Sequence, residues 1–249
     1  MKYFLLAALS AVLCLPVCAQ VQTCPAGTED MMNYFLMGYP NRLSSHMGPG
    51  TANPSFPYIS PDLGTNFATS GYFLWIKSTN GYPWDVKTFD QNYVYDRSTE
   101  LVWGDPTSFK RFNQDLPMSH RCAPIGKQGA TIKIPSASTN FTSYSNCQPA
   151  KVQNLGYVKN QISVPRSFDT KGNLGTVLER DFIYQYSCDS NYENCKYQEI
   201  FRLGYQVGIF DWRYYNNVNG KFQLVQESKI NHFGPGSATP YLPCSTSYE

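Results

Sequence analysis

Charged side chains are scarce in this 249-residue chain, because Asp, Glu, Lys and Arg make up 15% of it, against about 25% in an ordinary soluble domain. The formal net charge is +2, and the sequence contains no basic run. Proteins that bind nucleic acids or acidic membranes depend on such runs, so we expect neither partner. No apolar run reaches the length of a membrane span, so no transmembrane segment is expected.

Several motifs of enzymes are also missing. The sequence has no Gly-x-Ser-x-Gly elbow, no phosphate-binding or dinucleotide-binding glycine loop, and no Cys-x-x-Cys pair. The carboxylates considered for glycosidase chemistry are Glu179 and Asp181, which share one strand face, and Asp211 in an aromatic run. Pairing with arginine is the plainer interpretation of Asp211. The sequence leaves enzymatic activity open and favours a protein without it.

Aromatic residues are abundant, with 19 Tyr, 15 Phe and 4 Trp. They are dense between Asp181 and Lys229, where four strand-like runs follow one another. In the first of these runs Phe182 and the aromatics after it occupy every second position, which is the period of a strand. Asn219-Gly220 suits a two-residue type I′ turn between the last two runs. This stretch therefore predicts an antiparallel meander.

The rest of the chain adds further strand signals between turn residues, giving about ten strands in all. We expect two short helices, one over residues 28–37 with Thr28 as its cap and one beginning at Asp105-Pro106. The predicted fold class is all-β with minor α: an antiparallel β-sandwich or partly closed barrel with long loops, stabilised by disulfides. The sequence does not decide between sandwich and barrel.

The first residues indicate export. A positive start, an apolar run and a small-residue ending at Val17-Cys18-Ala19 predict a signal peptide over residues 1–19. Residues 20–249 are then expected to form a single secreted β domain, located outside the cell or in a periplasm. The length suits one all-β core.

Six cysteines remain after the predicted signal peptide, an even number that predicts three disulfides in an oxidising compartment. We expect Cys188 to pair with Cys195, because they bound a short polar loop between two strands that should form a hairpin. The other pairs are open, and our preference is for the following two: Cys122 with Cys147, and Cys24 with Cys244.

One heptapeptide occurs twice. His46-Met47-Gly48-Pro49-Gly50-Thr51-Ala52 is echoed by residues 232–238, which begin with His232. The Gly-Pro-Gly core of each copy suits a type II turn, so two similar turns are one interpretation. The other places the copies side by side, with His46 and His232 as metal ligands or as a base and its partner. No cofactor is expected apart from this candidate metal ion.

Function is therefore predicted from the aromatics. Exposed Tyr and Trp on a rigid sheet bind sugars by stacking, or anchor protein interfaces. Our leading hypothesis is a secreted protein that binds a glycan or an extracellular protein through Trp212, Tyr214, Trp84 and Trp75. The alternatives are a hydrolase or metal-dependent enzyme at the His46 and His232 loops, and a structural or envelope subunit.

Overall fold

The computed structural model describes part of the chain. The residues described are 22–36, 47–49, 55–58, 71–77, 83–100, 105, 107–126, 131–171, 175–229, 233–235 and 244. Within them the elements, in chain order, are β1 Thr28–Asp30, α1 Met32–Phe35, β2 Met47–Pro49, β3 Ser55–Tyr58, β4 Gly71–Lys77, β5 Pro83–Phe89, β6 Tyr93–Glu100, β7 Phe109–His120, β8 Cys122–Pro124, β9 Thr131–Ser145, β10 Gln148–Ser163, β11 Arg166–Asp169, β12 Thr176–Cys188, β13 Tyr197–Gly204, β14 Gly208–Val218, β15 Lys221–Lys229 and β16 Phe233–Pro235.

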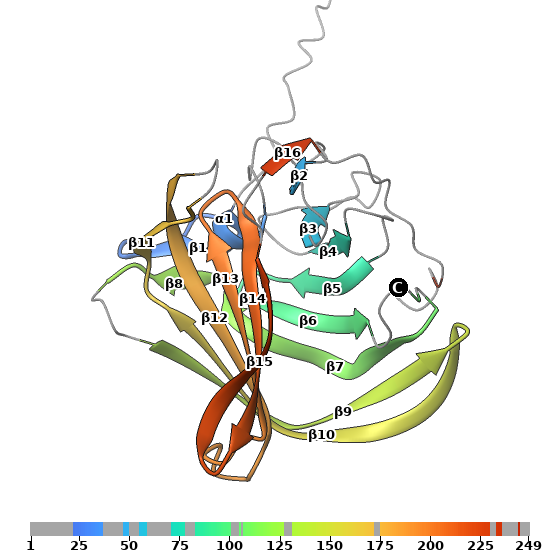
Figure 1. Ribbon diagram of the computed structural model, residues 1–249. Coiled ribbons are helices and arrows are strands. Elements are labelled where there is room, and N and C mark those ends of the chain that lie inside the picture. Colours follow the sequence, from blue (N-terminus) through green and yellow to red (C-terminus); the bar gives the residue numbers. More distant parts are fainter. Residues whose placement is uncertain are drawn as a thin grey trace, which may run out of the picture.

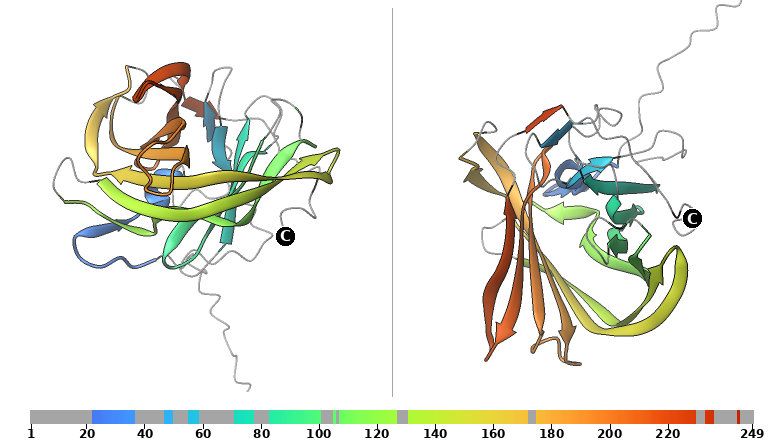
Figure 2. Two further views of the ribbon diagram at one scale, coloured as in Figure 1. Left: turned by 90° about the horizontal axis from the view of Figure 1, so that it is seen from below. Right: turned by 45° about the vertical axis from the view of Figure 1, so that its right-hand side comes forward.

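Most strands belong to one antiparallel sheet of 12 strands. Its order is β15-β14-β13-β12-β10-β9-β7-β6-β5-β4-β3, with β11 added beside β12. The sheet bends into two facing layers, with β12 to β15 running down one side and β5 to β7 crossing the molecule (Figure 1). The long strands β9 and β10 curve beneath and join the layers, which the views of Figure 2 show from two further directions. The predicted antiparallel all-β class is confirmed, and the sheet is open rather than closed into a barrel.

The predicted meander is β12 to β15. Each of its strands pairs with the next in antiparallel register. Asn219 and Gly220 have φ values of 54° and 79°, as a type I′ turn requires at both central positions. This turn therefore forms where the dipeptide predicted it.

Strands β9 and β10 form a long hairpin, with 15 and 16 residues respectively. Ser145 pairs with Gln148, and the two residues between them, Asn146 and Cys147, have φ values of 50° and 60°. A tight turn therefore sits at a cysteine rather than at a glycine. The hairpin carries mostly polar residues, so it lacks the apolar alternation that marks a half-buried strand.

The expected helix over residues 28–37 is mostly wrong. Thr28–Asp30 is strand β1, paired with β8, and α1 is a single turn from Met32 to Phe35. The Asp30 carboxylate accepts a hydrogen bond from the Met32 amide at 3.0 Å, so the acidic residue ends the strand and starts the turn. This segment packs against the sheet. Its core neighbours come from both layers, and the cluster comprises Met31, Met32, Tyr34, Phe35, Leu36, Phe89, Val94, Met118, Ala123, Ile162, Phe182, Phe201, Leu203 and Ile209.

The second expected helix is absent at its predicted place. The Asp105 carboxylate accepts hydrogen bonds from the Thr107 amide and from the Ser108 hydroxyl, at 2.9 and 2.6 Å, which closes a short turn. Phe109 then begins β7 and pairs with Tyr144 of β9, so the chain enters the sheet directly. Phe109 is buried.

Two of the three preferred disulfide pairings are wrong. Cys24 is bonded to Cys122, and Cys147 to Cys244, each with a Cα separation of 5.5 Å. The first bond follows from the β1–β8 pairing, whose register places Asp30 beside Cys122 and so brings the segment of Cys24 to this strand. Cys147 lies at the tip of the β9–β10 hairpin, far along the sheet from that pair. Sequence spacing could not reveal either arrangement.

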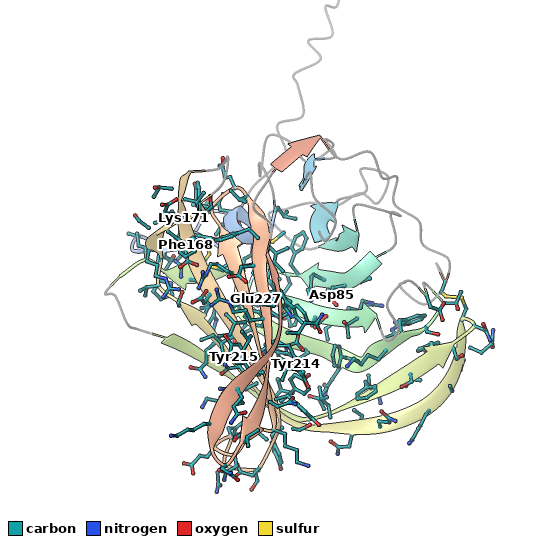
Figure 3. The ribbon with its side chains drawn as sticks, in the orientation of Figure 1. Asp85, Phe168, Lys171, Tyr214, Tyr215 and Glu227 are labelled. Atoms are coloured by element: carbon teal, nitrogen blue, oxygen red, sulfur yellow. A yellow bond between two sulfur atoms is a disulfide. The ribbon has the colours of Figure 1, made fainter. Side chains whose placement is uncertain are left out.

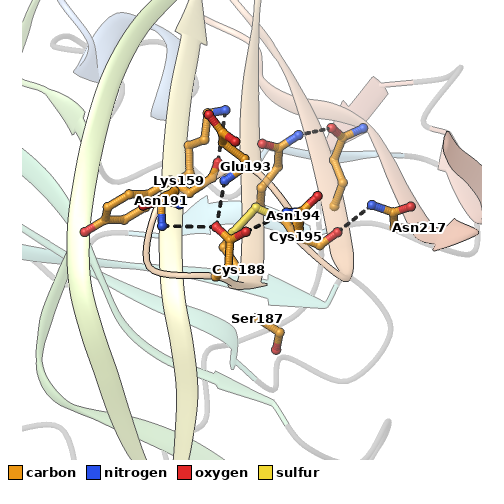
Figure 4. Close-up of a disulfide and its surroundings, with 12 residues drawn as sticks. Lys159, Ser187, Cys188, Asn191, Glu193, Asn194, Cys195 and Asn217 are labelled. Atoms are coloured by element: carbon orange, nitrogen blue, oxygen red, sulfur yellow. Dashed lines mark hydrogen bonds between the residues drawn. A yellow bond between two sulfur atoms is a disulfide. The ribbon is translucent and has the colours of Figure 1, made fainter. Parts of the chain in front are cut away.

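The pairing of Cys188 with Cys195 is confirmed. Their loop is closed by its own polar groups (Figure 4): the Asp189 carboxylate accepts hydrogen bonds from the amides of Asn191 and Glu193, at 3.1 and 3.0 Å. The Asn217 side chain of β14 donates to the Cys195 carbonyl at 2.8 Å. Asp189 therefore organises the hairpin tip.

Candidate functional site

A row of aromatic side chains crosses the inner face of the meander. Residues two apart share a strand face, and the register places Tyr186 beside Tyr197 and Phe201 beside Trp212. Four neighbouring ring pairs have centroid distances between 4.8 and 6.4 Å. We call this set the aromatic row: Tyr184, Tyr186, Tyr197, Tyr214 and Trp212. All five are half-buried, so one side of the row is packed and the other is accessible.

Three charged side chains face this row from the other layer. Lys87 of β5 lies between two carboxylates, with its Nζ 2.7 Å from Asp85 Oδ2 and 3.1 Å from Asp96 Oδ1. Their exposed fractions are 0% for Lys87, 3% for Asp85 and 8% for Asp96. We call these three residues the Lys87 cluster. Buried charges of this kind are rare unless they are paired, because losing water costs more free energy than one ion pair returns.

Burial and neighbouring charges shift the pKa values of Lys87 and Asp96. Burial, opposed by Lys87 and reinforced by Asp85, raises the pKa of Asp96 to about 7. Burial alone would lower the pKa of Lys87, but the two carboxylates outweigh it and the pKa is raised. Lys87 therefore stays charged at neutral pH, while Asp96 is close to its titration point.

Glu199 connects the aromatic row to the space in front of the cluster. It lies on the inner face of β13, where it accepts a hydrogen bond from Trp212 Nε1 at 2.7 Å and another from Tyr186. Burial raises the pKa of Glu199, although both hydrogen bonds and Lys110 oppose the shift. Its two donors are neutral groups, so they hold the carboxylate in place without cancelling its charge.

A cavity lies between two members of the aromatic row, Tyr184 and Tyr186, and the carboxylates of the Lys87 cluster. Its volume is about 50 Å³, and about 500 Å³ when the open space at its mouth is included. Figure 3 labels Asp85 of β5, which lines the cavity, and Tyr214 of β14, which belongs to the meander. The lining combines carboxylates with rings and apolar side chains: Asp85, Asp96, Thr99, Lys110, Phe112, Leu116, Met118, Phe182, Tyr184, Tyr186, Glu199 and Phe201. Binding sites for small ligands have this mixture of apolar walls and a few convergent polar groups.

The structure brings together part of the predicted site. Trp212 and Tyr214 are neighbours in the aromatic row, with ring centroids 6.4 Å apart, and Trp212 also packs against the core. Trp75 and Trp84 belong to β4 and β5, and their side chains lie outside the described part of the structure. Tyr184 and Tyr186 of the row line the cavity, and all five members of the row are half-buried.

The repeated heptapeptide forms a small sheet of its own. Strands β2 and β16 are antiparallel, and Gly48 of the first copy is paired with Gly234 of the second. Two segments far apart in the sequence are therefore adjacent, as one of the two interpretations required. His46 and His232 themselves lie outside the described residues. Within the described part of the chain, no three His, Cys, Asp or Glu side chains gather closely enough to hold a metal ion.

The residues missed by sequence reasoning are the buried charges. Glu199 alternates with Tyr197 and Phe201, so strand period alone places it on the aromatic face, and this signal was available. Lys87 and Asp96 gave no such signal, because charged residues at alternate positions of a strand normally face water. Their burial depends on the bend of the sheet, which no local pattern encodes.

The carboxylates considered for glycosidase chemistry lie on the opposite face of the meander. Glu179 and Asp181 both bond to Arg166 of β11, and Arg202 lies 3.2 Å from each. Asp211 lies 2.7 Å from Arg213. Burial, reinforced by Asp181, raises the pKa of Glu179 against the effect of these arginines. Ion pairs with arginine thus tie β11 to the outer face.

The chain matches no protein-family model, and no curated protein or solved structure is similar enough to count as a match. In the part of the chain that the structure describes, no helix has the length and apolar character of a membrane span. The function must therefore be argued from the cavity and the residues around it.

Proposed function

We propose that this chain is a ligand-binding protein that takes a sugar at the mouth of the cavity between its two layers. The observation that carries the proposal is the aromatic row, two of whose rings, Tyr184 and Tyr186, line a cavity whose far wall holds buried carboxylates. Sugar rings stack their C–H faces on Tyr and Trp, and their hydroxyls donate hydrogen bonds to carboxylates. Such a site needs an aromatic ring and a carboxylate no farther apart than the width of one sugar ring. Tyr184, Tyr186 and Glu199 all line this cavity.

The preorganisation of the row supports this function. Tyr186 and Trp212 both hydrogen-bond Glu199, and their rings are stacked in sequence with their neighbours. Side chains already held in place lose little conformational entropy when a ligand arrives. The proposal also locates the protein outside the cytosol, because three disulfides persist in oxidising compartments.

The test compares two tyrosines on one strand. Tyr214 belongs to the aromatic row, while Tyr215 lies on the outer face of β14 and hydrogen-bonds Arg213 (Figure 3). Neutral pyranoses, including glucose, galactose and N-acetylglucosamine, are titrated by calorimetry and by saturation-transfer NMR. Tyr214→Ala should weaken binding by about tenfold or more, as loss of an aromatic anchor does, and Tyr215→Ala should not. Trp212 is less suitable, because it also packs against the core.

Two results would overturn the proposal. One is the absence of binding by any sugar tested at millimolar concentration. The other is an equal loss of affinity in both tyrosine variants, which would place the ligand elsewhere or reveal a general effect on folding.

A second candidate function is a metal-dependent or hydrolytic site at His46 and His232. It is favoured by one observation, the pairing of β2 with β16. Metal content of the purified protein, measured by mass spectrometry before and after the double change His46→Ala and His232→Ala, decides it. A stoichiometric ion lost in the double variant supports this candidate, and a metal-free wild-type protein dismisses the metal site.

A further inference from the structure

The cavity between the two layers has more negative than positive side chains in and beside it. Three carboxylates line it, from Asp85, Asp96 and Glu199, while the ammonium groups near them are those of Lys87 and Lys110. Lys87 is shared between Asp85 and Asp96, so one ammonium faces two carboxylates. With every group ionised, which for Asp96 requires a pH above its pKa of about 7, the site carries one uncompensated negative charge.

Asp85 Oδ1 and Asp96 Oδ1 are the two carboxylate oxygens of cavity-lining residues that lack a hydrogen-bond partner among the described residues, and the second lies 3.1 Å from Lys87 Nζ. Asp85 is 3% exposed and uses its Oδ2 to bind Lys87, whereas its Oδ1 has no hydrogen-bond partner among the described residues. A buried carboxylate oxygen without a donor is unfavourable, and native proteins keep few of them. Because Asp85 lines the cavity, a ligand is able to supply the missing donor.

The walls of the cavity suit a cation as well. The rings of Tyr184 and Tyr186 are stacked with centroids 4.8 Å apart, and those of Phe182 and Phe201 lie 5.7 Å apart. All four line the cavity. The negative faces of aromatic rings attract ammonium groups, and the attraction is strongest where water is excluded.

From these observations we propose that the sugar bound at the mouth of this cavity is an amino sugar, whose ammonium group enters the cavity and is bound by Asp85 among the aromatic walls. This inference rests on the proposed function, because it selects one class among the sugars. A neutral sugar would satisfy Asp85 Oδ1 with a hydroxyl but leave the surplus charge in place. An acidic sugar would add a further negative charge beside buried carboxylates, which is strongly unfavourable.

Titration of the site agrees with a surplus of negative charge. The pKa of Asp96 is raised to about 7 in part by the charge of Asp85. Lys110 lies over the Phe141 ring, 5.3 Å from its centroid, and lowers the pKa of both Asp96 and Glu199 without cancelling the effect of burial. A cationic ligand would provide the charge that Lys87 and Lys110 do not.

The experiment compares three ligands on the full-length oxidised protein: glucosamine, N-acetylglucosamine and glucuronic acid. Calorimetry at pH 7 should give an affinity for glucosamine about tenfold higher than for N-acetylglucosamine, the worth of one charge-assisted hydrogen bond. Glucuronic acid should bind most weakly. Asp85→Asn should reduce the glucosamine preference to about twofold or less, while Asp169→Asn on the surface should retain it. Near-ultraviolet circular dichroism verifies that each variant is folded.

The outcomes separate the two proposals. Equal affinity for glucosamine and N-acetylglucosamine in the wild-type protein overturns the inference and leaves sugar binding intact. Binding by none of the three sugars contradicts the proposed function itself. A glucosamine preference that survives in folded Asp85→Asn also overturns the inference, because the ammonium is then recognised by another group.

Discussion

Asp30 and Arg121, separated by 91 residues in the sequence, form a buried two-pronged ion pair. Arg121 Nε lies 2.6 Å from Asp30 Oδ1, and its Nη2 lies 2.9 Å from Oδ2. The exposed fraction is 0% for the side chain of Arg121 and 6% for that of Asp30. Because Asp30 also accepts the Met32 amide, the pair joins α1 to the segment between β7 and β8.

We predict that Asp30→Asn destabilises the protein by about 3 to 5 kcal/mol, because it leaves the buried Arg121 guanidinium without the carboxylate that binds it through two hydrogen bonds. Guanidinium unfolding followed by fluorescence measures the change. The exposed ion pair of Asp169 with Lys171 provides the control, since Asp169→Asn makes the same chemical change in water and should leave stability nearly unchanged. Equal effects of the two substitutions would contradict the prediction.

The disulfide bonds should map as Cys24 with Cys122, Cys147 with Cys244, and Cys188 with Cys195. Proteolysis without reduction, followed by mass spectrometry, identifies the linked peptides directly. Removing the Cys147–Cys244 bond, which closes a loop of 97 residues, should cost about 4 to 5 kcal/mol on the loop-entropy model. Removing the Cys188–Cys195 bond, whose cysteines are 7 residues apart in the sequence, should cost about 2 to 3 kcal/mol. A peptide linking Cys122 to Cys147 would refute this connectivity.

The fold was predictable wherever local chemistry decided it. Alternating aromatics and Asn219-Gly220 predicted the meander correctly, because a two-residue turn fixes the register of the strands on either side. The same reasoning failed where contacts between residues far apart in the sequence decide the structure. Thr28 and the acids after it suit a helix cap, but Arg121 captures Asp30 and β8 pairs with the segment, so a strand forms instead.

The site was predictable to a smaller extent. Trp212 and Tyr214 were identified from their density and spacing, and the structure places both in the aromatic row. The Lys87 cluster was not identified, because the burial of its lysine depends on two carboxylates, one from β5 and one from β6, that lie beside it. That arrangement arises from the pairing of β5 with β6 and from the bend of the sheet.

Gly156 should resist substitution. It lies at an irregularity in the β9–β10 register with φ of +82°, and an added Cβ would approach Ser187 Cα to 3.2 Å. Gly156→Ala should therefore destabilise the protein by about 1 to 2 kcal/mol, the cost of the left-handed conformation for a residue with a side chain. Gly126→Ala is the control, because an added Cβ there meets no atom within 4 Å. Thermal unfolding of both variants checks the difference, and similar midpoints would refute it.

Asp96 should make stability depend on pH in an unusual direction. Its pKa is raised from 3.8 to about 7 in the folded protein, so between these values the folded state holds a proton that the unfolded state has lost. The contribution of Asp96 to the free energy of unfolding is therefore fully present near pH 4. It falls as pH rises to about 7, by at most about 1.4 kcal/mol per pH unit. Asp96→Asn cannot titrate and should lose this part of the slope.

Guanidinium unfolding at four pH values between 4.5 and 7.5 measures the slopes of the wild-type protein and of Asp96→Asn. Glu179 and Glu199, whose pKa values are also raised by burial, are present in both proteins, so the difference in slope isolates Asp96. The pKa of Asp169 is lowered by its bond to Lys171, so Asp169→Asn should keep the wild-type slope in this range. Parallel plots of the free energy of unfolding against pH for wild type and Asp96→Asn would contradict the prediction. They would show that the Asp96 carboxylate is ionised throughout this range, with Lys87 stabilising the charges of both Asp85 and Asp96.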